Sequence, residues 1–187
     1  METAVLAIGT RKGLWLATSE DRARWQLSPP HFLMHEIPSV AVDTRGGRTR
    51  VLVGMRSEHW GPTVVHSDDL GATWSEPEQG AITFGAGDGA ALERVWQIQP
   101  DGEDRPGVVW AGCEPISVWR STDHGEHFDL VRGLWDHPHR DRWGAGYGGA
   151  AAHSVLPSPV EGTTRGSQNA RVGSGNAKPA GMTPTTS

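Results

Sequence analysis

Two glutamates occupy matching places in the chain, where a pair of carboxylates could act on a glycosidic bond. Glu58 and Glu114 each follow a short apolar run, Arg50-Val-Leu-Val-Gly54 and Gly107-Val-Val-Trp-Ala-Gly112. Hydrolysis of a glycosidic linkage usually needs two carboxylates, one on each side of the scissile bond. We therefore predict Glu58 and Glu114 as the catalytic pair. The alternates are Glu93 and Asp136.

Arginine, histidine and tryptophan side chains gather in the segments expected to lie on the same side as these glutamates. Guanidinium groups bind carboxylates in bidentate pairs, and indole rings stack on the C–H faces of sugar rings. The residues predicted to bind a substrate are Arg11, Arg56, Trp60, Arg94, His137, Arg140 and Trp143. The alternative is that these loop residues are simply solvated and that the tryptophans pack between strands.

Three other chemistries have weaker support in the sequence. A metal site could use His137, His139 and His153 with Asp136 or Asp141, but this spacing matches no helical or hairpin ligand pattern. Cys113 could be a nucleophile, although no base accompanies it in a motif. Gly85-Ala-Gly-Asp-Gly89 lacks the strand and helix that flank a phosphate-binding loop. We expect no metal and no cofactor.

The elements that would position these residues are marked by a repeated pattern, Ser-x-Asp-x-Gly-x-x-aromatic. Serine and aspartate side chains can accept hydrogen bonds from turn N–H groups, glycine can adopt positive φ, and the aromatic ring can pack in the core. The residues given this structural role are Ser67, Asp69, Gly71, Trp74, Ser121, Asp123, Gly125 and Phe128. A third copy begins at Ser19 and closes with Trp25, but Ala23 replaces its glycine and it is one residue shorter.

The spacing of the copies predicts the fold class. Ser19, Ser67 and Ser121 lie 48 and 54 residues apart, which is close to the length of a four-stranded propeller blade. Short apolar runs flank each copy and predict four strands per unit, A to D, with the repeated pattern at the C–D turn. The prediction is an all-β fold, an arc of about three four-stranded propeller blades. The units are residues 4–28, which lack strand A, then 37–78 and 92–133, and a fourth that starts at 149–159.

The end of the sequence changes in character. Residues 160–187 are rich in Gly, Ser, Thr, Asn, Pro and Ala, which predicts a disordered low-complexity tail after a propeller region over residues 1–159. About three blades do not close a ring, because propellers need about four, and an open arc leaves apolar blade faces uncovered. Two explanations stay open: truncation or a frameshift of a longer propeller, or self-association of copies through the exposed faces.

The two clean copies resemble the Asp box of BNR-repeat proteins, the propeller group that includes bacterial sialidases and related glycosidases. Trp110-Ala-Gly-Cys-Glu-Pro115 and Gly133-Leu-Trp-Asp-His-Pro138 share this resemblance, which covers residues 4–159. It implies a carbohydrate site on the face formed by the B–C and D–A loops and, if the chain is an enzyme, an exo-α-sialidase-like glycoside hydrolase.

The chain also departs from the sialidase pattern. The Arg-Ile-Pro motif is absent, and the single tyrosine, Tyr147, lies in a glycine run. No sialidase catalytic residue is therefore carried over to this sequence. The alternatives are a non-catalytic interaction or assembly propeller and an inactive fragment, since Asp boxes occur in enzymes and non-enzymes alike.

Composition and charge exclude several classes of partner. The 187 residues include 17 Lys+Arg against 22 Asp+Glu, for a formal net charge of −5, which gives no basic surface for nucleic acid or an anionic membrane. No run approaches the ~18–20 apolar residues of a membrane span, and the N-terminus does not resemble a signal peptide. We expect a cytoplasmic protein whose partners are a carbohydrate ligand and further copies of itself.

Overall fold

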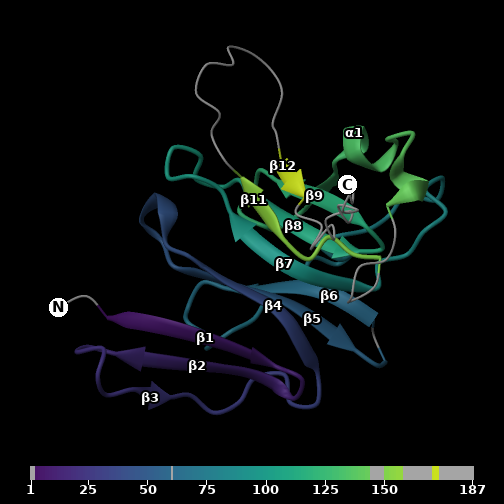
Figure 1. Ribbon diagram of the computed structural model, residues 1–187. Helices are drawn as coiled ribbons and strands as arrows, with labels where there is room; N and C mark the ends of the chain where they lie inside the picture. Colours follow the sequence, from purple (N-terminus) through teal and green to yellow (C-terminus); the bar gives the residue numbers. More distant parts are fainter. Residues whose placement is uncertain (1–2, 60, 144–149, 158–169, 173–187) are drawn as a thin grey trace, which may run out of the picture.

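The protein is all-β, with three antiparallel sheets stacked one on another (Figure 1). The computed structural model describes residues 3–59, 61–143, 150–157 and 170–172. Sheet 1 contains β1 (Ala4–Thr10), β2 (Gly13–Ser19) and β3 (Gln26–Leu27), and sheet 2 contains β4 (Glu36–Asp43), β5 (Arg50–Ser57) and β6 (Gly61–Ser67). Sheet 3 contains β7 (Arg94–Pro100), β8 (Val109–Glu114), β9 (Ser117–Ser121) and β10 (Asp129–Leu130).

A two-stranded sheet follows sheet 3. It pairs β11 (Val155–Pro157) with β12 (Ala170–Val172), and β11 contacts β7 and β8. β12 falls within the segment predicted as a tail; the rest of residues 160–187 lies outside the described residues. The remaining elements are two 3-10 turns, η1 (Arg45–Gly47) and η2 (Arg140–Arg142), and the short helix α1 (Arg132–Trp135). No helix of the described residues is long and apolar enough to cross a membrane.

Sheet 2 differs from the four strands expected for its unit. After β6, only an isolated bridge between His66 and Ser75 stands where the outer strand was predicted. The following residues are Glu76 and Pro77, and proline cannot donate a hydrogen bond to a strand ladder. Sheet 1 has the three strands expected of a unit without strand A, and sheet 3 has four strands.

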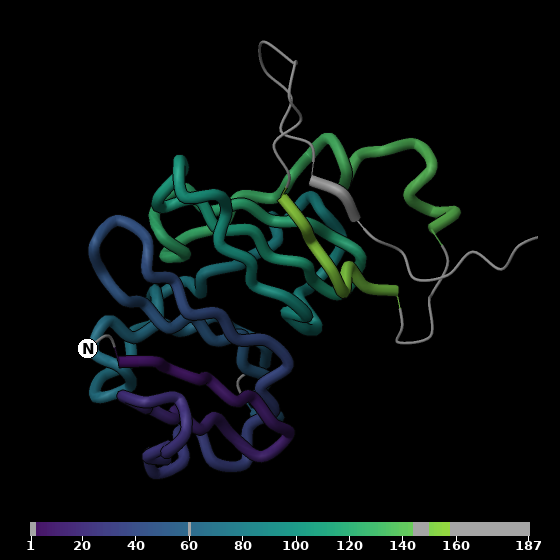
Figure 2. The backbone as a smooth tube through the Cα atoms, turned by 60° about the vertical axis from the view of Figure 1, so that its left-hand side comes forward, coloured from purple at the N-terminus to yellow at the C-terminus, as the bar shows by residue number. Residues whose placement is uncertain are grey.

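Alternating side chains bury both faces of the middle sheet. On β5, Val51 and Val53 pack with Leu14 and Leu16 of β2, whereas Leu52 faces the other way, among the core side chains of sheet 3. This alternation follows from the two-residue period of a strand. Beyond sheet 3, Trp110 and Val118 pack against Ala152 and Val155 of the β11 segment. Sheets 1, 2 and 3 and the β11 segment follow one another in this order (Figure 2), and an apolar layer fills each of the three gaps between them.

The two clean boxes form the same hydrogen-bonded turn. The Ser67 hydroxyl donates to Asp69 Oδ1 (2.8 Å) and accepts from the Gly71 N–H (2.7 Å), and Asp69 also accepts from the Thr73 N–H (2.8 Å). The second box repeats these contacts through Ser121, Asp123, Gly125 and His127. Two consecutive residues have positive φ in each box, and the second is the glycine. The structural role predicted for these residues agrees with this geometry.

Each box also contacts the preceding sheet. A Cβ at Gly71 would lie 2.9 Å from Leu16 Cδ1, and one at Gly125 would lie 2.7 Å from Leu52 Cδ2. The closing ring Trp74 packs on Phe32 with centroids 4.8 Å apart, and Phe128 belongs to the apolar layer that contains Leu52. The box glycine is therefore needed for close packing of sheets as well as for the turn.

Protonation of Asp69 at low pH should lower the stability of the folded protein. Hydrogen bonds from the Thr73 side chain, the Thr73 N–H and the Ser67 hydroxyl lower its pKa from 3.8 to about 2. A carboxyl whose folded-state pKa is depressed contributes stability above the unfolded value, and this stability is lost as the pH falls toward the folded value. We therefore expect the urea midpoint of the protein to fall between about pH 4 and pH 2, and to fall less steeply in Asp69→Asn, which is already less stable at neutral pH. Asp104→Asn is the control, because this carboxylate is 81% exposed. An equal slope in Asp69→Asn and the parent would contradict the assignment.

Candidate functional site

Charged residues occupy matching register positions at one end of sheets 2 and 3. Glu36, at the start of β4, pairs across the ladder with Arg56 of β5, and Arg94, at the start of β7, pairs with Glu114 of β8. The acid is on the first strand, β4, in sheet 2 and on the second strand, β8, in sheet 3, so the charge order is reversed between the sheets. Stacking the sheets then places opposite charges opposite one another.

These four residues form a continuous ion-pair chain. Glu36 Oε2 lies 3.8 Å from Arg56 Nη1 and 3.2 Å from Arg94 Nη2, and Arg94 Nη1 lies 3.7 Å from Glu114 Oε2. The side chains of Glu36, Arg94 and Glu114 are 25%, 21% and 19% exposed, so solvent reaches each of them. Arg94 is the central member, since its guanidinium lies between the two carboxylates.

A tryptophan completes this group. Trp96 donates its indole N–H to Glu114 Oε2 (3.1 Å), and the guanidinium carbon of Arg94 lies 4.6 Å from the centre of its ring. His153 packs on Trp96 with ring centroids 4.7 Å apart. We call Glu36, Arg56, Arg94, Trp96, Glu114 and His153 the strand-end site.

Irregularities in the ladders of β4 and β7 orient these side chains. The ladder of β4 with β5 shifts between Glu36 and Ser39, and that of β7 with β8 shifts between Val95 and Gln97, which leaves Trp96 without a partner opposite. Bulges are common beside functional sites because they redirect a side chain from the regular alternation. Here the bulge allows Trp96 to reach Glu114.

A groove of about 360 Å³ runs along β4 and β7 next to the site. Trp96 forms part of its lining, together with Pro38, Gln97 and Gln99. The Gln97 amide donates to Gln99 Oε1 (3.3 Å), and Gln97 Oε1 accepts from the Val155 N–H. The volume lies within the range of small-ligand sites, and the lining offers an indole ring beside amide donors and acceptors.

The structure brings together only some of the residues predicted from the sequence. Arg56, Arg94 and Glu114 lie in the strand-end site, whereas Glu58 and Arg11 lie on exposed turns after β5 and β1. Glu114 contacts Arg94 and Trp96 rather than Glu58, and the proposed catalytic pairing stays a prediction. Trp60 lies outside the described residues.

The other predicted binding residues form a second group on the segment after sheet 3. His137 stacks on Trp143 with centroids 5.5 Å apart, and the guanidinium of Arg140 lies 3.6 Å from the ring centre of Trp135. Trp135 is buried and also contacts Phe84. The first two contacts lie within the segment, and the third links it to sheet 3, because Phe84 also packs on Trp119 of β9. Part of the predicted substrate loop is therefore packed structure.

Three residues of the site were missed among the predicted binding residues: Glu36, Trp96 and His153. A signal for Glu36 was available, because Glu36-Ile37 and Arg94-Val95 begin equivalent strands with opposite charges. Trp96 reads as one more apolar residue of a strand, and only the bulge turns it toward Glu114.

The weaker chemistries gain no support in the structure. Burial raises the pKa of the Cys113 thiol, whose side chain is fully covered. Gly85-Ala-Gly-Asp-Gly89 is a turn in which the Gly85 N–H donates to Asp88 and Asp88 pairs with Arg132, so an acid stands where a phosphate would bind. Within the described ranges, no group of three or more His, Cys, Asp and Glu side chains is placed to hold a metal ion.

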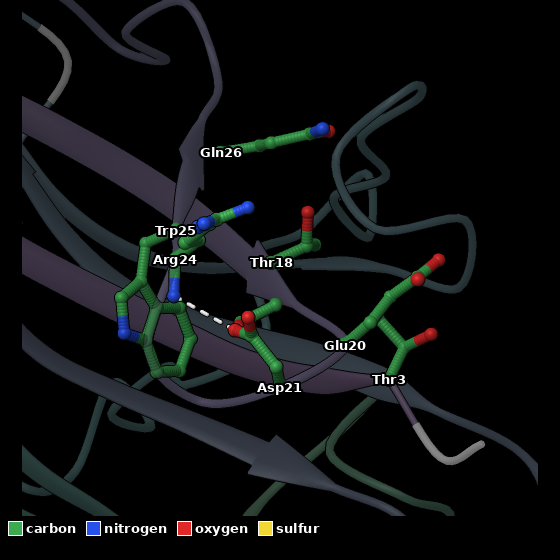
Figure 3. A pocket seen from close by; sticks show the side chains of 8 residues that line it. Thr3, Thr18, Glu20, Asp21, Arg24, Trp25 and Gln26 are labelled. Atoms are coloured by element: carbon green, nitrogen blue, oxygen red, sulfur yellow. Dashed lines mark hydrogen bonds between the residues drawn. The ribbon is translucent and has the colours of Figure 1, made fainter.

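The incomplete first box borders another hollow, of about 320 Å³ (Figure 3). Asp21 accepts hydrogen bonds from the Ala23 and Arg24 N–H groups (2.9 and 2.8 Å), and these contacts lower its pKa. Its carboxylate is thus engaged by the turn. Trp25, which closes this box, remains 39% exposed.

Comparison with known proteins adds no relative: no protein-family model matches the chain, and no curated protein matches its sequence.

Proposed function

We propose that this chain is an arc of an Asp-box β-propeller of the sialidase-like type and that it binds carbohydrate at the strand-end site. Three features support the blade assignment: consecutive antiparallel sheets stacked face to face, two boxes with the same hydrogen bonds, and box glycines that each pack on the preceding sheet. In such a propeller, β4 and β7 are inner strands, and the groove beside them opens on the central channel.

The observation that carries the proposed binding function is the position of Arg94 between Glu36 and Glu114, beside Trp96. A sugar presents hydroxyl groups that bond to carboxylates and guanidinium groups, and a C–H face that packs on an indole ring. The Nε of Arg94 is buried and has no hydrogen-bond partner among the described residues, and unsatisfied buried donors of this kind often mark a site for a water or a ligand.

The same arrangement favours binding over hydrolysis. In a glycosidase the scissile bond occupies the space between the two carboxylates. In the strand-end site the Arg94 guanidinium occupies the space between Glu36 and Glu114. The enzymatic alternative is a hydrolase that uses Glu58 and Glu114. It predicts turnover of a fluorogenic glycoside that is abolished by Glu58→Gln and by Glu114→Gln.

The binding function can be tested with a glycan array that contains neutral and sialylated sugars, followed by calorimetry on the best ligand. We expect Arg94→Gln to lower affinity at least about ten-fold, because charge-assisted hydrogen bonds contribute about 1.5–3 kcal/mol. Trp96→Phe should remove the change in tryptophan fluorescence on binding. Glu103→Gln, on the exposed turn before β8, is the matched control and should bind as the parent does.

Two results would contradict this proposal. One is a folded protein that binds no glycan on the array. The other is binding whose affinity does not change in Arg94→Gln or Glu114→Gln.

A non-catalytic assembly propeller is the second candidate function. A specific observation favours it: Leu6 and Ile8 on the outer face of sheet 1 are 47% and 43% exposed. Apolar side chains clustered on one face of a sheet are typical of an interaction surface.

A further inference from the structure

One apolar face of sheet 1 is exposed to solvent, whereas the equivalent faces of sheets 2 and 3 are covered. Gly9, Gly54 and Gly112 are equivalent, because a Cβ on each would meet the inner strand of the next sheet, at Ile37, Val95 and Val155. The residues one and three positions before these glycines are Ile8 and Leu6 in β1, Val53 and Val51 in β5, and Ala111 and Val109 in β8.

These equivalent residues differ sharply in exposure. Val51, Val53, Val109 and Ala111 are each 0% exposed because they pack on the preceding sheet, whereas Leu6 and Ile8 are 47% and 43% exposed. The closing ring of the box behaves in the same way: Phe128 is 6% exposed and Trp25 is 39% exposed. Leu6 and Trp25 line a hollow of about 400 Å³ on this face. Among the described residues, no sheet covers this face of sheet 1.

The two ends of the stack have complementary defects. β5 and β8 each have an inner neighbour, β4 or β7, whereas the inner edge of β1 has none among the described residues. β11 is the next inner strand, since Val155 contacts Gly112 as Val95 contacts Gly54. It pairs only with the three residues of β12 in the described part of the chain. Sheet 1 thus lacks an inner strand, and β11 is an inner strand without a full sheet.

We propose that two copies of this chain close on each other by placing β11 of each copy on the inner edge of β1 of the other. Sheets 2 and 3 lie between β1 and β11 within one copy (Figures 1 and 2), so the strand comes from a second copy. In this exchange β1 takes the place of β12 beside β11. The described residues of each copy then contribute three sheets, and two copies give twice three, or six, within the range of about four to eight blades seen in propellers. This assembly rests on the propeller arrangement proposed above, but it does not depend on the ligand of the strand-end site.

The register of the exchange follows from the other sheets. Glu36 pairs with Arg56 and Arg94 pairs with Glu114. The equivalent residues in the new sheet are Ser154 of one copy and Arg11 of the other, and both are exposed. Cysteines at these two positions would therefore face each other across the new ladder, at a separation that a disulfide can span.

The first experiment measures mass in solution by light scattering after size exclusion. We expect twice the mass of the 20.1 kDa chain for the parent and the monomer mass for the double variant Leu6→Asp/Ile8→Asp, with unchanged far-ultraviolet circular dichroism. Leu33→Asp/Met34→Asp is the control, because these residues are also exposed, at 57% and 82%, but lie between β3 and β4; it should stay dimeric. A folded parent that is monomeric at all accessible concentrations overturns the proposal.

The second experiment distinguishes the strand exchange from other dimers. Arg11→Cys and Ser154→Cys proteins are unfolded together, refolded as a mixture and oxidised mildly. The exchange predicts a disulfide-linked dimer that contains one chain of each variant, whereas neither variant alone should cross-link. Cross-linking of Arg11→Cys with itself would indicate edge-to-edge pairing of two β1 strands and would overturn the exchange.

Discussion

Replacement of Arg45 by methionine is expected to lower the free energy of unfolding by about 3–5 kcal/mol, the range found when one partner of a buried ion pair is removed. Arg45 lies in η1, between β4 and β5, and forms a two-pronged pair with Asp43: Nε to Oδ1 and Nη2 to Oδ2 are both 2.7 Å. The two side chains are only 4% and 3% exposed. The variant would leave the Asp43 carboxylate buried without its cation.

The pair also joins two sheets. The Arg45 guanidinium donates to the carbonyls of Arg105 (3.1 Å) and Val108 (2.9 Å), in the turn that precedes β8. Loss of Arg45 therefore frees acceptors in sheet 3 as well as the carboxylate in sheet 2, and leaving such buried groups unpaired is costly.

The measurement is urea unfolding of three variants at neutral pH. The double variant Asp43→Leu/Arg45→Met should recover much of the loss, because an apolar pair of similar volume leaves no buried charge. Arg24→Met, on the exposed first box, should change stability by less than about 0.5 kcal/mol. A loss below about 1 kcal/mol in Arg45→Met would show that the pair is weakly coupled to folding.

Replacement of Gly112 by alanine is expected to detach the β11 segment from sheet 3. The new Cβ would overlap the carbonyl oxygen of Ala152 and lie 2.9 Å from Val155 Cγ2. The Ala152 N–H also donates to the Cys113 carbonyl (3.0 Å), so the crowding falls on a backbone contact that has little freedom to shift. Overpacking of this kind costs about 1–3 kcal/mol.

Hydrogen exchange would locate the effect. We expect faster exchange at Ala152 and Val155 and around Trp110, which these residues cover, with little change in sheet 1. Gly133→Ala is a matched control, because a Cβ at Gly133 meets nothing within 4 Å and alanine suits a helix better than glycine. Exchange rates at Ala152, Val155 and Trp110 that are the same in Gly112→Ala as in the parent would contradict the close-approach role of Gly112.

Local patterns were sufficient to predict most strands. The apolar run over residues 50–54 lies within β5, and most of the run over residues 107–112 lies within β8, because apolar runs bounded by turn residues fix a strand without reference to distant parts of the chain. The box turns were predictable for the same reason, since all their hydrogen bonds are made within a few residues. The arrangement of the sheets as propeller blades stays a prediction.

The candidate site was less predictable, because it depends on register and on bulges. Glu58 and Glu114 occupy similar places in sequence, but the ladders place Glu36 and Arg94 at the strand ends. Glu114 therefore meets Arg94, which also pairs with Glu36 of the neighbouring sheet. Nothing local in the sequence says that Trp96 is the residue left unpaired in β7. Spacing thus indicates which residues lie near a strand end, whereas the contacts between sheets decide which of them meet.

The close approach at Gly9, Gly54 and Gly112 also has a geometric consequence. At these positions a glycine of one sheet faces β4, β7 or the β11 segment of the next, whereas the bulky rings of Trp74 and Phe128 fill the apolar layers on the side of the box turns. We therefore expect each layer to be thinner at the glycine edge, and a row of such layers to curve toward that edge. A methyl group at any of these three glycines should widen that edge and flatten the curve.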